Sequence, residues 1–179
     1  MENNCKIVFL GESRVGKTSL ISRFMTGTYE DGIESTSIAL FSSKTIEIQG
    51  QLLRFDMWDT AGQEKYRSLT KFFYKDIDIA ILVYDITNRK SFEEIRDYWY
   101  NQVRTMGMNN PIIGFVGNKC DKVDEAEISE NEARDFTACS DAEFGLASAV
   151  ENIGIDDLLL RLGTKYLNVM KKYENPSGN

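Results

Sequence analysis

Residues 11–18, with the sequence GESRVGKT, follow the pattern GxxxxGK[ST]. They come directly after an apolar run, residues 5–10, and lead into residues 18–25, which have helical character. In this context glycines let the backbone wrap closely around a phosphate, and successive N–H groups form an anion site at a helix N-terminus. Lys17 would neutralise phosphate charge, and the Thr18 hydroxyl is a hard oxygen ligand suited to magnesium. The alternative, a chance glycine turn, is rare for an octapeptide of this composition.

A second polar segment, residues 118–121 (NKCD), follows the apolar run 111–116. The carboxylate of Asp121 could accept hydrogen bonds from both N1–H and the 2-amino group of guanine, whereas adenine offers neither donor. A buried carboxylate left unpaired costs about 1–3 kcal/mol, so the pattern favours GTP over ATP. NKxD is weak by itself and gains weight from its place at a strand end downstream of a phosphate loop. The alternative is a solvated polar loop.

Residues 59–64 (DTAGQE) form a third polar segment, directly after the predicted strand 52–57. Asp59 could hold magnesium through water, and the Gly62 amide could reach a γ-phosphate. Gln63 carries both a donor and an acceptor, so it could orient an attacking water. The alternative for this segment is an ordinary surface turn.

The composition narrows the chemistry further. The chain of 179 residues has no histidine, which excludes Ser-His-Asp triads, Cys-His pairs and histidine metal sites. A metal here is expected to be a hard cation on oxygen ligands, such as Mg2+. The net charge of −7 disfavours a nucleic-acid role. Three widely spaced cysteines, Cys5, Cys120 and Cys139, suggest reduced thiols, with one disulfide as the alternative.

Hydrophobic patterns predict the elements that position these segments. The expected strands are residues 5–10, 44–48, 52–57, 79–84 and 111–116, with a hairpin around residues 49–51. The expected helices are residues 18–25, 91–108 (Ser91 as N-cap and Glu94 as its partner), 130–138 (Ser129 and Glu132) and 155–170. This alternation predicts an α/β fold with a doubly wound, mainly parallel sheet, one antiparallel edge strand and helices on both faces.

Taken together, the motifs resemble the Ras-like small GTPases over essentially the whole chain. GESRVGKT, Thr36, WDTAGQE, GNKCD and a late SA dipeptide occur in that family's order. Within the superfamily the chain looks most like a Rab, because of residues 82–87 (LVYDIT), the stretch WDTAGQEKYRSL, and the spacing of Phe41, Trp58 and Phe73. The resemblance implies a P-loop NTPase fold with a six-stranded sheet and about five helices, over residues 1–173, followed by a flexible tail, residues 174–179.

The resemblance also implies residue roles. Gln63, Lys17 and Thr36 would act in catalysis, and Thr18, Thr36 and Asp59 would hold the metal. The expected nucleotide-binding set is Ser13, Arg14, Val15, Gly16, Lys17, Thr18, Ser19, Tyr29, Thr36, Gly62, Asn118, Lys119, Asp121, Ser148, Ala149 and Val150. Tyr29 would pack against guanine, and Ser148 and Ala149 would contact the base mainly through backbone N–H groups. Effector candidates are Ile38, Phe41, Trp58 and Phe73. Core packing is the alternative for the three aromatic residues, and an ordinary sheet edge is the alternative for the apolar segment around Ile38.

Four positions depart from a typical Rab. Arg14 and Ile38 stand where glycine is usual, Ile33 stands where tyrosine often covers the phosphates, and Val150 replaces a lysine near the base. One interpretation is lineage drift with activity kept. The other is altered nucleotide handling, in which Arg14 favours faster exchange or slower hydrolysis, and at the extreme a pseudo-GTPase or interaction module.

The function expected from these observations is slow hydrolysis of GTP to GDP, which switches effector binding in vesicle trafficking. GTP and GDP are the expected ligands, Mg2+ the cofactor, and a GEF, a GAP and effectors the partners of a monomer. A nucleotide kinase ranks last among the alternatives. No cysteine follows Cys139, so we expect no prenyl anchor on the chain as given. We expect it to be cytoplasmic, and peripheral on endomembranes if a lipidated tail or second domain lies outside it.

Overall fold

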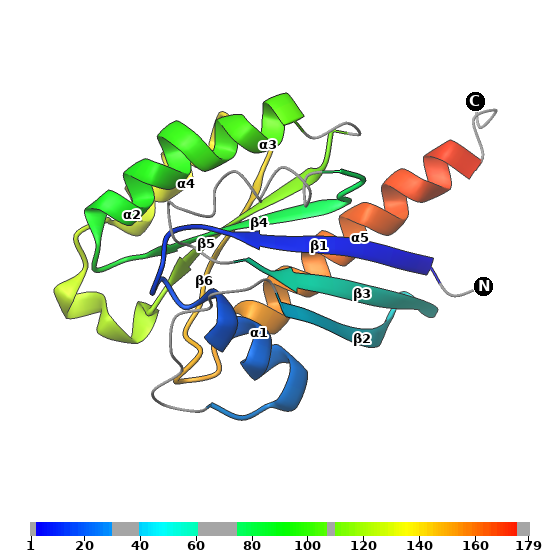
Figure 1. The fold of residues 1–179 in the computed structure, drawn as a ribbon, viewed down its shortest axis with the longest axis horizontal. Helices are drawn as coiled ribbons and strands as arrows, with labels where there is room; N and C mark the ends of the chain where they lie inside the picture. Colours follow the sequence, from blue (N-terminus) through cyan, green and yellow to red (C-terminus); the bar gives the residue numbers. More distant parts are fainter. Residues whose placement is uncertain (1–2, 30–39, 61–74, 107–109, 175–179) are drawn as a thin grey trace.

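The computed structural model describes residues 3–29, 40–60, 75–106 and 110–174. A six-stranded sheet in the order β2-β3-β1-β4-β5-β6 crosses the molecule (Figure 1). Its strands are β1 Asn3–Leu10, β2 Leu40–Ile48, β3 Gln51–Asp59, β4 Ile79–Asp85, β5 Ile112–Asn118 and β6 Glu143–Leu146. Only β2 pairs antiparallel with its neighbour, and the other four pairings are parallel. The predicted sheet with one antiparallel edge strand is confirmed.

Helices cover both faces of this sheet (Figure 1). They are α1 Lys17–Thr26, α2 Arg89–Glu94, the π-helical turns η3 Ile95–Trp99, α3 Tyr100–Met106, the 3-10 segment η4 Cys120–Glu125, α4 Glu130–Ala138 and α5 Ile155–Glu174. One apolar cluster joins the sheet to α1 and α5, and a second joins the opposite face to α2, η3, α3 and α4. Among the described residues, none of the helices combines the length and apolar character needed to cross a bilayer.

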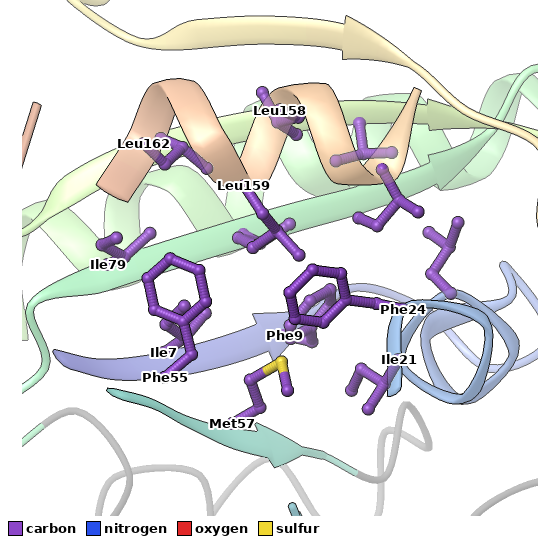
Figure 2. Packing of buried hydrophobic residues seen from close by; sticks show 14 of the residues in the cluster. Ile7, Phe9, Ile21, Phe24, Phe55, Met57, Ile79, Leu158, Leu159 and Leu162 are labelled. Atoms are coloured by element: carbon purple, nitrogen blue, oxygen red, sulfur yellow. The ribbon is translucent and has the colours of Figure 1, made fainter. Parts of the chain in front are cut away.

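The packing on the α1 and α5 face of the sheet follows from the alternation of side chains along the strands and from the helical spacing of apolar residues. Alternate residues of β1 and β3 point to this face, including Ile7, Phe9, Phe55 and Met57 (Figure 2). Facing them are side chains at helical spacing from α5 (Leu158, Leu159 and Leu162) and from α1 (Ile21 and Phe24). All of these side chains are buried. This layer fixes where both ends of α1 lie, and the N-terminal end follows the glycine loop, residues 11–16.

The β2–β3 hairpin turns over two residues rather than the three expected. Ile48 pairs with Gln51, and the turn residues Gln49 and Gly50 both have positive φ, 53° and 75°. Two successive positive φ values match a type I′ turn, whose twist suits an antiparallel hairpin. Glycine tolerates that backbone at the second position.

The predicted cap of the helix at residues 91–108 was wrong. Helix α2 begins at Arg89, and the side chain of Asn88 caps it by accepting from the Ser91 N–H. Ser91 lies inside the helix, where its hydroxyl accepts from the Asp85 N–H and donates to the Asn88 carbonyl. Both Asn88 and Ser91 are good capping types, and contact with β4 decided between them.

At α4 the predicted Ser129 cap is confirmed, since its hydroxyl accepts from the Glu132 N–H at 3.1 Å. The Glu132 carboxylate, however, binds the guanidinium of Arg89. The sixth strand β6 and the segment η4 were not located from the sequence, because each is short and lacks a strong apolar period. The expected tail lies outside the described residues except for Glu174, the last residue of α5.

Candidate nucleotide-binding site

The glycine loop joins β1 to α1, as the sequence predicted. Gly11 and Gly16 both have positive φ, 140° and 97°. A Cβ on Gly11 would lie 2.2 Å from the Val83 carbonyl oxygen, and one on Gly16 would lie 2.2 Å from Nδ2 of Asn118. Any larger residue at either position would therefore push the loop away from β4 or β5.

Arg14 occupies the left-handed region of backbone space, with φ of 67°. Its side chain is exposed. Glycine adopts this conformation without strain, whereas a residue with a Cβ is strained by roughly 1–2 kcal/mol. The departure from glycine noted in the sequence thus falls where the loop backbone favours glycine.

Lys17 lies under the loop rather than in solvent. Its Nζ donates to the carbonyls of Gly11 and Glu12, both at 2.9 Å, and its side chain is buried. Burial lowers the pKa of Lys17 to about 8, while the carboxylates of Asp59 and Glu12 oppose that shift. A phosphate at the loop would supply further negative charge to this ammonium.

Two oxygen donors meet beside Lys17. The Thr18 hydroxyl donates to Oδ2 of Asp59 at 2.5 Å, and Asp59 is only 3% exposed. Asp59 reaches this place because β3 ends beside β1, where it pairs with Phe9. Hydroxyl and carboxylate oxygens are the ligands that Mg2+ prefers, so this donor set fits the expected cation.

The other end of the site is a pocket of about 210 Å³, into which loops from several elements converge. Its lining residues are Gly16, Ser19, Tyr29, Asn118, Lys119, Asp121, Lys122, Ala149 and Val150. Asn118 is buried, and its Nδ2 donates to the Val15 carbonyl at 2.8 Å. This contact joins the carboxyl end of β5 to the glycine loop, so the two ends of the site are held at a fixed separation.

Two polar contacts hold the NKCD segment in place. Lys119, with φ of 65°, pairs its Nζ with Oδ2 of Asp85 at 2.5 Å. Asp121 accepts from the Ser148 hydroxyl at 2.5 Å. Ser148 is fully buried and its own N–H donates to the Ile153 carbonyl. The Ser148 N–H, expected to contact the base, is thus already paired, and the side chain of Ser148 contacts the NKCD segment.

Several candidates lie outside the described residues. They are Ile33, Thr36, Ile38, Gly62, Gln63 and Phe73. Of the expected aromatic trio, Phe41 and Trp58 pair across β2 and β3 with ring centroids 5.0 Å apart. Phe41 is 49% exposed, as is suitable for a partner surface. The three cysteines are free thiols, in agreement with the expectation.

Three contacting residues were not singled out from the sequence. Asp85 binds Lys119, Arg23 binds the carbonyls of the 149–150 loop, and Trp99 of η3 donates to Oε1 of Glu12 at 3.2 Å. Each contact joins residues from distant parts of the chain. Asp85 ends a strong apolar strand, which is a usable signal, but no local pattern marks the other two.

Comparison with known proteins agrees with this geometry. The Ras family model matches residues 6–168. Human Ras-related protein Rab-22A is 36% identical over 160 residues, which cover 89% of this chain and 82% of that protein. Rab5A of Oryza sativa subsp. japonica is 34% identical over 175 residues (98% and 86%), and human Rab-21 is 37% identical over 174 residues (97% and 77%). The chain therefore belongs to the Ras family of small GTPases, as a Rab-like member.

Proposed function

We propose that this protein binds GTP and GDP with Mg2+, hydrolyses GTP to GDP and phosphate, and changes partners with the bound nucleotide. The observation that carries the proposal is the hydrogen bond from Asn118 to the Val15 carbonyl, because it joins two groups of polar residues. On one side of it lie Lys17 and the Thr18–Asp59 pair, and on the other lies Asp121. This spacing suits phosphates at one end and a purine at the other.

The residues divide the chemical work as follows. Lys17 and the loop N–H groups stabilise negative charge on the phosphates. Thr18 and Asp59 would hold Mg2+, which would supply positive charge beside the phosphates. Gln63, which lies outside the described residues, orients the attacking water. The chain has no histidine to act as a general base, so we infer an intrinsic turnover on the order of 10⁻³ s⁻¹ or slower.

Partner exchange follows from contacts to the γ-phosphate. We infer that the GTP and GDP forms differ at about residues 30–42 and 60–75, most of which lie outside the described residues. Phe41 belongs to the first of these segments and its ring packs on Trp58. Both contribute to the effector surface together with Ile38 and Phe73. A GAP supplies an arginine in trans and a GEF accelerates GDP release. Resemblance to Rabs favours a role in vesicle trafficking for a monomer that acts on endomembranes.

Guanine preference rests on Asp121, whose carboxylate Ser148 orients. The 2-amino group of guanine and its N1–H together offer two donors to this carboxylate. A pseudo-GTPase is the second candidate, because Arg14 departs from glycine at a position with positive φ. A pseudo-GTPase would bind guanine nucleotides like the GTP-hydrolysing switch but would not hydrolyse GTP.

The first experiment identifies the nucleotide in the purified protein by denaturing it and separating the released nucleotides by chromatography. A working switch should release GDP, because GTP taken up from the cell has been hydrolysed. Release of GTP supports a pseudo-GTPase, and release of no nucleotide argues against both candidates.

A second step measures hydrolysis of bound GTP with and without EDTA, together with a Lys17→Ala variant. EDTA should stop hydrolysis, and Lys17→Ala should abolish nucleotide retention. Binding of ATP with the same affinity as GTP would contradict the role assigned to Asp121.

A further inference from the structure

Arg23 lies in the last turn of α1, outside the set of residues that line the nucleotide pocket. Its guanidinium donates three hydrogen bonds to backbone carbonyls. Nε reaches the Ala149 carbonyl at 2.6 Å, Nη2 reaches Val150 at 2.8 Å, and Nη1 reaches Gly27 at 2.8 Å. One side chain thus joins two loops that are more than 120 residues apart in the chain.

The first of these loops carries one wall of the pocket. Gly27 ends α1 in a left-handed conformation with φ of 71°, and its N–H donates to the Arg23 carbonyl at 2.8 Å. Two residues further on, the ring of Tyr29 lies with its centroid 5.9 Å from the Arg23 guanidinium carbon. Arg23 therefore contacts the start of this segment through hydrogen bonds and its pocket residue through a cation–π contact.

The second loop supplies another part of the pocket lining. Ala149 and Val150 line the pocket, and both of their carbonyls are bound to Arg23. The neighbouring Ser148 is held separately, by its backbone pair with Ile153 and by its contact with Asp121. Loss of Arg23 would therefore release residues 149–150 while leaving the Ser148–Asp121 contact in place.

We propose that Arg23 is a positioning residue that holds Tyr29 and the 149–150 loop at a fixed separation, and thereby sets how long a guanine nucleotide remains bound. The inference rests on the nucleotide-binding function proposed above. Three hydrogen bonds from a single planar fork give a geometry that a lysine ammonium cannot reproduce. Because Arg23 touches neither the phosphate loop nor Asp121 in these contacts, it should affect nucleotide release and leave hydrolysis and base preference unchanged.

The test measures dissociation of a fluorescent GDP, labelled on the ribose, from the Mg2+-loaded protein after addition of excess GDP. Arg23→Gln should release it roughly tenfold faster or more, by loss of two or three hydrogen bonds. Single-turnover hydrolysis of preloaded GTP, and the preference for GDP over IDP, should stay within twofold of the wild type. Arg23→Lys should give an intermediate rate.

Arg161 of α5 is the matched control. Its guanidinium also bridges elements, since it binds Asp157, Glu143 and the Phe144 carbonyl, but it does not line the pocket. Arg161→Gln should leave the release rate unchanged, even where it lowers the melting temperature. If both arginine variants accelerate release equally, Arg23 acts through general stability and the proposal is wrong.

Other outcomes distinguish the role of Arg23 from the proposed nucleotide-binding function. A wild-type protein that holds no GDP overturns the proposed function, whatever the variants do. A wild type that holds GDP, with Arg23→Gln releasing it at the same rate, overturns only the role of Arg23. Should Arg23→Gln fail to fold, an Arg23→Lys protein with the wild-type release rate would overturn it equally.

Discussion

Ser148 donates its hydroxyl hydrogen to a carboxylate oxygen of Asp121 at 2.5 Å, although 27 residues separate them in the chain. The serine is fully buried, whereas the aspartate is exposed at the pocket. The same hydroxyl oxygen accepts from the Glu151 N–H at 3.1 Å, which fixes its orientation. The buried hydroxyl of Ser148 thus orients the exposed carboxylate of Asp121, and it does so without contacting a nucleotide itself.

Ser148→Ala should weaken GDP binding about three- to tenfold, because loss of one hydrogen bond to a charged group removes on the order of 1 kcal/mol. Titration calorimetry with GDP measures this change. Ser140→Ala removes another buried hydroxyl, one that donates to the Phe136 carbonyl in the turn after α4, and should leave GDP affinity unchanged. Equal affinities for wild type and Ser148→Ala would show that Asp121 needs no orienting partner.

The lowered pKa of Lys17 should make both the stability of the fold and the binding of GDP depend on pH. Its pKa in the folded protein is lowered to about 8 from an ordinary 10.5, mainly by burial. Between these two pH values the unfolded chain binds more protons than the folded one, so this residue makes the nucleotide-free protein more stable as pH rises from about 8 to 10.5. Below pH 8 both states are protonated and the contribution is constant.

Nucleotide binding has the opposite dependence, because phosphate charge favours the protonated ammonium. GDP binding at pH 8.5 should therefore take up protons, and its affinity should fall as pH rises further. Calorimetry in two buffers of different ionisation enthalpy measures the uptake, with pH 6.5 as the reference at which Lys17 contributes none. The same proton uptake at pH 6.5 and at pH 8.5 would assign it to another group.

The left-handed backbone at Arg14 should give the Arg14→Gly and Arg14→Ala variants different free energies of unfolding. Arg14→Gly relieves roughly 1–2 kcal/mol of left-handed strain but loses about 0.4–1 kcal/mol through the more flexible unfolded chain. Arg14→Ala removes the same exposed side chain and keeps the strain. The glycine variant should therefore be more stable than the alanine variant by up to about 1.6 kcal/mol, measured by denaturant unfolding at one fixed GDP concentration. An alanine variant at least as stable would mean that the loop relaxes without strain.

Gly163 of α5 allows the helix to approach β2 and β3 closely. A Cβ there would lie 2.5 Å from Cδ1 of Ile48 and 2.8 Å from Cζ of Phe55, and both side chains are buried. Gly163→Ala gains about 1 kcal/mol of helix propensity but overpacks the core by about 1–3 kcal/mol, so net destabilisation is expected. Asn168→Ala, at an exposed position of the same helix, should be neutral or stabilising in the same unfolding experiment. Stabilisation by Gly163→Ala would contradict the tight packing.

Much of the architecture could be predicted because its signals lie in neighbouring residues. The apolar runs of β1, β4 and β5 and the helical period of α5 appear within a few residues each, and the glycine loop is a contiguous octapeptide. The cap of α2 could not be predicted in this way. Asn88 and Ser91 have similar capping propensity, and the choice depended on the hydrogen bond that Ser91 makes to Asp85 of β4.

The sequence by itself determined the family, the order of the motifs and the residues expected at the phosphates and the base. Only the tertiary structure decided which side chains hold them in place. Ser148 reaches Asp121, Lys119 reaches Asp85, and Arg23 reaches Ala149 across 126 residues. These partners meet because parallel strands bring their carboxyl ends to one edge of the sheet, where the loops that follow them converge. Such contacts depend on the packing of α1 and α5 against the sheet, which no local pattern of residues records.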